Sequence, residues 1–155
     1  MLEERNRDED ILRAYASTVF AQRFSASVDV DWEEFEFDTT AVTPTGVFQD
    51  RIQTTRIRPE LRYFNPTGFF ASIRATRYDQ EVDQFDTLDA TARTTVESEF
   101  WVTDATLGYR FPKRWGSFVL EGRNLSNRKF EFYERTILET VIPARTILAR
   151  LEITY

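Results

Sequence analysis

The feature that most constrains this chain is the alternation of apolar and polar residues along most of its length. In the final stretch, residues 144–155, every second residue back from Tyr155 is apolar, and most of those between are polar or charged. A period of two places successive side chains on opposite faces of a β-strand, whereas helical periodicity is weak here. The same alternation predicts strands over residues 11–20, 25–37, 51–64, 68–82, 99–111 and 116–124.

The connections between these segments alternate between two kinds. Short turns are predicted at residues 21–25, 65–68 and 112–116. Long polar connections are predicted near residues 38–50, 83–97 and 125–141. The pattern predicts an all-β, antiparallel up-and-down meander of about seven long strands, with the tight turns at one end and the long loops at the other. We expect residues 11–155 to form one β-barrel segment, preceded by a charged segment, residues 1–10.

Composition excludes several classes of function. The chain has 155 residues and a net charge of −6 at pH 7, so a nucleic-acid partner is not expected. Neither Cys nor His is present, which removes disulfides, thiolate nucleophiles, imidazole bases and metal sites with nitrogen or sulfur ligands. Carboxylate pairs such as Asp29–Asp31 and Glu33–Glu34 have the spacing of ordinary strand neighbours. We therefore predict no catalytic residues, no cofactor site and no metal site.

The polar faces of the predicted strands are rich in arginine and acidic residues. Only Lys113 and Lys129 are lysines. Guanidinium groups form forked hydrogen bonds to carboxylates in a confined space. One such row is typical of the solvated face of a soluble protein, whereas rows on successive strands indicate a charged lumen. The residues predicted to line it are Arg56, Arg58, Glu60, Arg62, Arg74, Asp104, Arg110, Glu121, Arg123, Arg150 and Glu152.

The placement of the aromatic residues favours a membrane around the apolar face. One group lies near the short turns: Phe20, Phe24, Tyr63, Phe69, Tyr109, Phe111, Trp115, Phe118 and Tyr155. A second lies near the long loops: Trp32, Phe35, Phe37, Tyr78, Phe100, Trp101 and Phe130. From Trp101 to Tyr109 is about 27 Å along a strand. At a tilt of about 40° this spans about 20 Å, close to the ~25 Å apolar band of an outer-membrane barrel.

The C-terminal part of the sequence carries a more specific pattern. The stretch LGYRFPKRWGSFVLEGRNLSNRKFEF, followed by PARTILARLEITY, resembles the last hairpins of TonB-dependent outer-membrane receptors. In that family an apolar strand leads into an NL-(S/F)-(N/D) element, a variable loop, a P-R-T element and a strand ending in an aromatic residue. The matching residues here are Asn124, Leu125, Ser126, Asn127, Pro143, Arg145, Thr146 and Tyr155. The resemblance covers roughly residues 99–155.

The resemblance implies a location in the outer membrane of a Gram-negative-type bacterium. It implies outer-membrane lipid and the barrel-assembly machinery as partners, the latter reading Leu151, Ile153 and Tyr155 as an assembly signal. It also implies binding or transport of a solute, whose identity the sequence does not reveal. Bacterial single-chain barrels have even strand numbers, so we expect the C-terminal part of a larger barrel. Two alternatives stay open: a porin-type barrel fused to another domain, and a soluble lipocalin-like barrel with its apolar residues inside.

Overall fold

The computed structural model describes residues 7–37, 47–86, 89–128, 132–134, 137–141 and 144–154. Its main element is one seven-stranded antiparallel sheet in the order β1-β2-β3-β4-β5-β6-β9, and β7 pairs with β8 in a separate two-stranded sheet. The strands are β1 (Arg7–Phe20), β2 (Phe24–Phe37), β3 (Val47–Phe64), β4 (Phe69–Asp86), β5 (Asp89–Arg110), β6 (Gly116–Arg123), β7 (Phe132–Glu134), β8 (Ile137–Val141) and β9 (Thr146–Ile153). The predicted all-β, up-and-down meander is confirmed.

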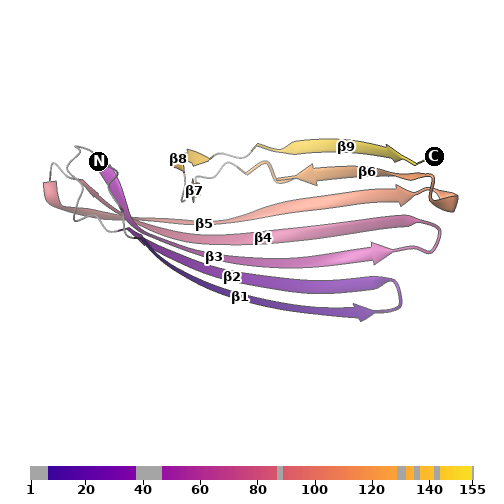
Figure 1. Cartoon of the computed structure of the whole chain (residues 1–155), viewed down its shortest axis with the longest axis horizontal. Helices are drawn as coiled ribbons and strands as arrows, with labels where there is room; N and C mark the ends of the chain where they lie inside the picture. The colour runs from indigo at the N-terminus through magenta and orange to yellow at the C-terminus, as the bar shows by residue number, and fades with distance from the viewer. Residues whose placement is uncertain are drawn as a thin grey trace.

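The strands are not all of one length. Figure 1 shows β1 to β5 running side by side as long ribbons, with the shorter β6 and β9 continuing the sheet at the end where the tight turns lie. Strand β5 has 22 residues, but only Ala105–Arg110 pair with β6. No helix in the described part of the chain has the length and apolar character needed to cross a bilayer.

Several segments predicted as loops are strand, and these predictions were wrong. Strand β4 runs to Asp86 and β5 begins at Asp89, so most of the predicted loop 83–97 is paired backbone. Charged side chains do not prevent this, because they point away from the sheet while β-branched threonines favour the extended backbone. Strand β1 likewise begins at Arg7, inside the expected charged segment. Strand β3 begins at Val47, and β7 and β8 lie within the predicted loop 125–141.

The predicted tight turns are confirmed, and left-handed backbone closes them. Ala21 and Gln22, with φ of 49° and 58°, connect β1 to β2. In the β3–β4 turn, the Gly68 N–H donates to the Asn65 carbonyl oxygen at 2.9 Å. Gly68 has φ of 103°, and a Cβ there would lie 2.3 Å from the Arg110 carbonyl oxygen, so the position needs glycine. A short 3-10 turn, Pro112–Arg114, connects β5 to β6.

Cross-strand register fixes which residues share a face of the sheet, because directly opposed residues point to the same side. One row joins Glu60, Arg74 and Asp104, and we call this side the arginine face. The adjacent row on the other side joins Leu61 and Ile73, and we call it the leucine face. Leu61 and Ile73 are 41% and 51% exposed, so the leucine face here is apolar and uncovered.

The two faces exchange polarity along the strands. We use the row Val30, Ile57, Arg77 and Trp101 as a boundary, calling the sheet on the side of the tight turns the turn half and the rest the loop half. In the loop half the leucine face carries the row Glu34, Gln53, Glu81 and Glu97. The arginine face there carries the row Phe35, Ile52, Val82 and Val96. The apolar residues Ile52 and Val82 are 2% and 0% exposed and Phe35 is also buried, whereas Val96 at the end of the row is half-buried.

Burial is confined to one side of the sheet. The buried residues of β2 to β5 in the described part of the chain are Asp31, Phe35, Ile52, Thr54, Thr76, Gln80, Val82, Phe100, Val102 and Gly108, and the register places all of them on the arginine face. In a single sheet, side chains converge and cover one another only on a concave side. The arginine face is therefore the concave face, and the leucine face is the convex one.

Candidate functional site

All of the charged residues predicted to line a lumen lie on the arginine face. Strands β3 to β5 contribute Arg56, Arg58, Glu60, Arg62, Arg74, Asp104 and Arg110, and strands β6 and β9 contribute Glu121, Arg123, Arg150 and Glu152. The rows are continuous from strand to strand: for example, Val119 lies opposite both Gly108 and Arg150. The alternation read from the sequence therefore places these residues together. That this face lines a lumen stays a prediction.

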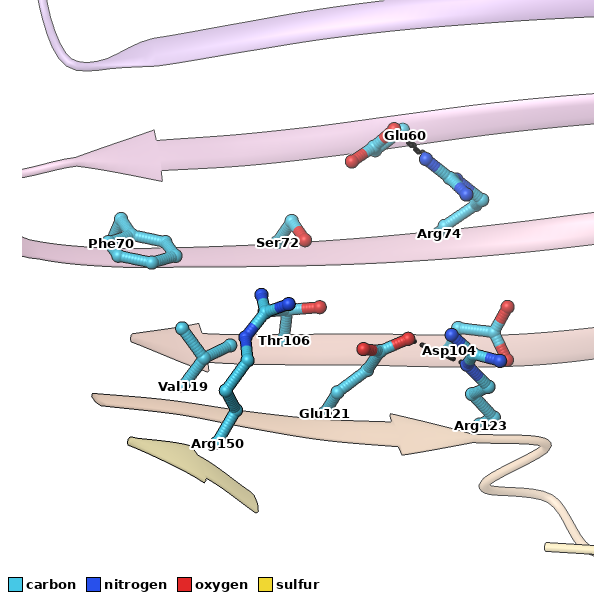
Figure 2. A pocket seen from close by; sticks show the side chains of 10 residues that line it. All are labelled: Glu60, Phe70, Ser72, Arg74, Asp104, Thr106, Val119, Glu121, Arg123 and Arg150. Carbon is cyan, nitrogen blue, oxygen red and sulfur yellow. Dashed lines mark hydrogen bonds and ion pairs between the residues drawn. The ribbon is translucent and has the colours of Figure 1, made fainter. Parts of the chain in front are cut away.

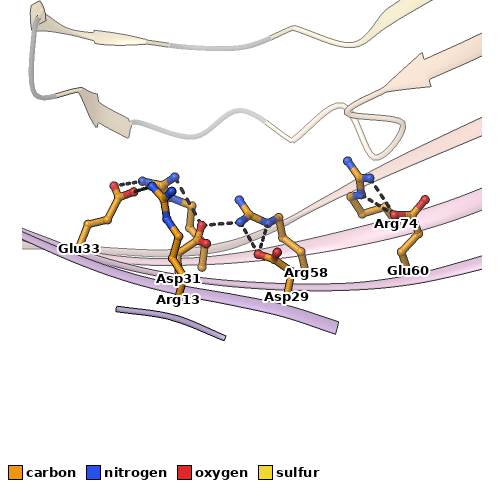
Figure 3. Close-up of polar contacts among 8 residues, drawn as sticks. Arg13, Asp29, Asp31, Glu33, Arg58, Glu60 and Arg74 are labelled. Atoms are coloured by element: carbon orange, nitrogen blue, oxygen red, sulfur yellow. Dashed lines mark hydrogen bonds and ion pairs between the residues drawn. The ribbon is translucent and has the colours of Figure 1, made fainter. Parts of the chain in front are cut away.

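A network of ion pairs joins β1, β2 and β3 on this face. Its members are Arg13, Asp29, Asp31, Glu33, Arg56 and Arg58. Arg13 Nη2 lies 3.5 Å from Glu33 Oε1, and Arg56 Nη1 lies 3.8 Å from Asp31 Oδ2. Figure 3 shows the side chains of Arg13, Asp29, Asp31, Glu33 and Arg58 extending from one side of the sheet. Asp31 is 4% exposed, and its flanking guanidinium groups offset the cost of burying its charge.

Arg13, Asp29, Asp31 and Glu33 were not among the residues predicted to line a lumen. Of these, Asp29, Asp31 and Glu33 are the ion-pair partners of Arg56 and Arg58. The sequence does contain a signal for these acidic residues, because the alternation over residues 25–37 puts Asp29, Asp31 and Glu33 on one face of a strand. What the sequence lacked was the register, which sets Asp29 opposite Arg58 and Asp31 opposite Arg56.

An open hollow of about 560 Å³ lies on the arginine face of the turn half, lined from β3, β4, β5, β6 and β9 (Figure 2). Its charged lining residues are Glu60, Arg74, Asp104, Glu121, Arg123 and Arg150. Arg74 Nη2 lies 2.7 Å from Glu60 Oε2, and Arg123 Nε lies 2.6 Å from Glu121 Oε1. Glu60 also pairs with Arg62 at 2.7 Å. These pairs leave the hollow with a nearly balanced charge.

Asp104 supports the turn that follows β6. Its Oδ1 accepts the Asn124 backbone N–H at 2.9 Å. Asn124 is 3% exposed, has φ of 48°, and its side-chain amide donates to the Arg128 carbonyl oxygen at 3.0 Å. Leu125 folds back over Gly122, where a Cβ would lie 2.6 Å from Leu125 Cδ2. The Asn-Leu-Ser-Asn element of the sequence is therefore a compact turn that ends β6 against β5.

The aromatic residues near the tight turns form a connected group on the leucine face. Phe24 lies between Phe20 and Tyr63, with ring centroids 5.7 Å and 5.0 Å away, and Tyr63 lies 6.3 Å from Phe69. Tyr109, opposite Phe69, extends the group to β5. This arrangement is typical of an interfacial girdle.

The second aromatic group does not form one band. Trp32 and Trp101 lie on the leucine face, at or next to the boundary row. Tyr78 and Phe100 lie on the arginine face and stack with centroids 5.0 Å apart, and Phe35 is buried on the same side. The group near the long loops therefore divides between the two faces, because position along the chain does not say which face a residue occupies. Phe130 lies outside the described residues.

The residues of the predicted assembly signal lie at the edge of the sheet. Leu151 and Ile153 are on the leucine face of β9 and are 60% and 66% exposed. Tyr155 lies outside the described residues.

The leucine face of the loop half carries ion pairs of its own. Arg51 bonds to Glu34 and lies 3.9 Å from Glu81 and 3.8 Å from Asp83. The hydrogen bond that Arg51 donates to the Glu34 carboxylate raises the pKa of the Arg51 guanidinium above its usual value, so the group stays charged at any physiological pH. Among the described residues, no set of acidic side chains is arranged to hold a metal ion.

Comparison with known proteins adds no family: no family model, curated protein sequence or solved structure matches this chain.

Proposed function

We propose that this chain is a transmembrane part of an outer-membrane β-barrel that binds or moves a solute, similar to a TonB-dependent receptor. The observation that carries the proposal is the polarity of the turn half. Its convex face is apolar and exposed, and its concave face carries arginines and carboxylates. An apolar face directed outward is favourable in lipid and unfavourable in water.

The loop half supports the same proposal by contrast. Beyond the ion pairs of Arg13 and Arg56 next to the boundary, the apolar row Phe35, Ile52 and Val82 is on the concave face and the charged row is on the convex face, as in a protein surrounded by water. The two faces exchange polarity near Trp101 and Arg77, an aromatic and a basic residue of the kind that anchors a protein at a membrane interface. We propose that the turn half spans the membrane and the loop half projects into water.

The alternative of a soluble, lipocalin-like barrel is less well supported. Such a barrel needs apolar side chains on its concave face along the whole strand. In the turn half the concave face instead carries the Glu60–Arg74 pair, while Ile73 is exposed on the convex face.

The direction of the edge strands supports membership of a larger barrel. Strands β1 and β9 are the two edges of a seven-strand antiparallel meander, so they run in the same direction. Closing the sheet on itself would need a parallel pair, whereas an odd number of further strands would keep every pair antiparallel. A closed barrel is needed in lipid because free backbone groups at an edge are costly there. Receptor-type and porin-type barrels both satisfy this requirement.

Membrane insertion tests the proposal. The complete barrel that contains this chain is refolded with phosphatidylcholine vesicles, as a variant in which Trp101 is the only tryptophan. We expect the protein to float with the vesicles, to resist extraction by urea, and to show quenching of Trp101 by lipids brominated near the headgroup. A monomeric protein that stays in solution without detergent would contradict the proposal and favour the lipocalin-like alternative. Ion conductance across a planar bilayer would favour the porin-type barrel over the receptor type.

A further inference from the structure

The hollow on the arginine face contains three polar side chains without a hydrogen-bond or ion-pair partner among the described residues. Arg150 lines the hollow and forms no ion pair or hydrogen bond with any residue that the structure describes. The hydroxyl groups of Ser72 and Thr106, which face each other across β4 and β5, likewise have no partner in the described part of the chain. Figure 2 shows the Arg150 side chain extending across β6 toward Thr106. One guanidinium and two hydroxyl groups are thus directed into one space.

The wall on the turn side of these groups is apolar. Phe70 and Val119 line the hollow there, and Arg110 lies over the Phe70 ring at 5.6 Å from its centroid. The ring also lies over Gly108, where a Cβ would be 2.1 Å from a ring carbon. A flat apolar surface therefore lies beside the uncommitted donors.

We infer that this hollow binds a small organic anion, a carboxylate attached to an aromatic or other apolar body. The carboxylate accepts hydrogen bonds from Arg150, Thr106 and Ser72, and the body packs against Phe70 and Val119. Arginine favours planar carboxylates because its fork matches their two oxygens. A volume of about 560 Å³ is within the usual range for small-molecule sites.

The charges of the lining residues balance, so it is the position of Arg150 rather than the overall charge of the hollow that favours an anion. The carboxylates of Glu60 and Glu121 are already paired with arginines, and Asp104 accepts the Asn124 N–H. Arg150 contributes a positive charge without a local counterion among the described residues. The inference rests on the proposed function, since it names the class of solute, but binding itself requires only the folded hollow.

Titration of the full chain, refolded in detergent micelles, tests the inference. Sodium benzoate is the probe, with benzyl alcohol as its neutral match and acetate as the anion without an apolar body. Backbone amide chemical shifts at Thr106 and Val119 report binding. We expect saturable binding of benzoate that is tighter than that of either comparison compound. Arg150→Gln should weaken benzoate binding about tenfold or more, the effect of one charge-assisted hydrogen-bond donor.

The matched control is Arg114→Gln, which removes the same charge from an exposed position in the β5–β6 turn. It should leave the benzoate affinity unchanged. Three results would each overturn the inference: equal losses of benzoate affinity in Arg150→Gln and Arg114→Gln, equal affinities for benzyl alcohol and benzoate, or no saturable binding of benzoate. If Arg150→Gln does not fold, Arg150→Lys decides: it keeps the charge but loses the fork, and an unchanged affinity contradicts the inference. Vesicle insertion without benzoate binding would remove this inference alone, and binding without insertion would remove the proposed function alone.

Discussion

Ile73 and Ile52 are the same residue type on neighbouring strands of one sheet, yet they lie in opposite environments. Ile73 is 51% exposed on the convex face of the turn half, whereas Ile52 is 2% exposed on the concave face of the loop half. Alternation therefore does not fix which face of a strand is apolar along its whole length. The apolar face points outward where we propose lipid and inward where we propose water.

The charged residues follow this contrast in part: next to the boundary, the Arg13–Glu33 and Arg56–Asp31 pairs remain on the concave face of the loop half. In the turn half, Arg74 pairs with Glu60 on the concave face. In the loop half, Arg77 pairs with Glu99 at 2.9 Å on the convex face. The physical reason is that charged groups remain where water can reach them, whichever side of the sheet that is.

The largest expected effect comes from shortening the two isoleucines. Ile52→Ala should destabilise the protein by about 2–5 kcal/mol, because it leaves a cavity in a packed row. Ile73→Ala should cost at most about 1 kcal/mol, because lipid chains fill the vacated space. Urea unfolding of the vesicle-inserted protein measures both, and equal costs would break the contrast between the halves.

The next largest effect comes from placing a charge on each face of the turn half. Ile73→Arg should cost about 2–4 kcal/mol if the side chain meets the middle of a bilayer. The neighbouring Ser72→Arg points into the hollow and should cost less than about 1 kcal/mol. Comparing the folded yield and the urea midpoint of the two variants in vesicles checks this. Tolerance of arginine at Ile73 would mean that the convex face is in water.

The turn after β6 should show an intermediate effect. Asn124→Ala removes hydrogen bonds to Arg128 from a side chain that is 3% exposed, so we expect a loss of about 1–3 kcal/mol. Asn127→Ala is the control in the same turn, because the backbone N–H of Asn127 donates to the Asn124 carbonyl while its side chain has no hydrogen-bond partner among the described residues. Equal destabilisation by both variants would show that backbone strain, not the Asn124 amide, determines the stability of this turn.

A smaller effect should come from Gly108→Ala. Its new Cβ would overlap Phe70 ring carbons, but the ring borders an open hollow and can rotate into it. We expect a loss of about 1 kcal/mol, the low end for an overpacked site. In a protein that already carries Phe70→Ala, adding Gly108→Ala should cause no further loss of stability. A loss of several kcal/mol in the single variant would mean that the hollow is not open.

The smallest effect should come from the ion pair at the boundary. Arg77→Gln removes the ion pair with Glu99. The Arg77 side chain is 36% exposed and the Glu99 side chain 59%, so the protein should lose less than about 1 kcal/mol of stability. The difference from the unsubstituted protein should shrink further as salt is added. A large, salt-independent loss would place this pair away from water and shift the boundary toward the loop half.

The sequence was sufficient for the fold class and for the face on which each predicted lumen residue lies. Alternation and turn residues such as Gly68 predict strands and hairpins directly. The continuation of β4 and β5 through residues 83–97 was missed because charged residues mark solvated loops and solvated strand faces alike. The polarity exchange at Phe35 and Ile52 was missed because it is seen only when residues on neighbouring strands are aligned. That alignment is the strand register, which alternation within one strand does not give. That Arg150 has no ion-pair partner among the described residues likewise depends on side-chain positions, which the alternation of residue types does not give.

The most direct test of the central claim is a nitroxide scan along the convex face of β4. The chain has no cysteine, so single cysteines at Ala71, Ile73, Ala75, Asp79 and Glu81 can be labelled without background. For the vesicle-inserted protein, we expect labels at Ala71, Ile73 and Ala75 to collide mainly with oxygen, which concentrates in lipid. Labels at Asp79 and Glu81 should collide mainly with a water-soluble nickel chelate. Equal access of the nickel chelate at all of these positions would contradict the account.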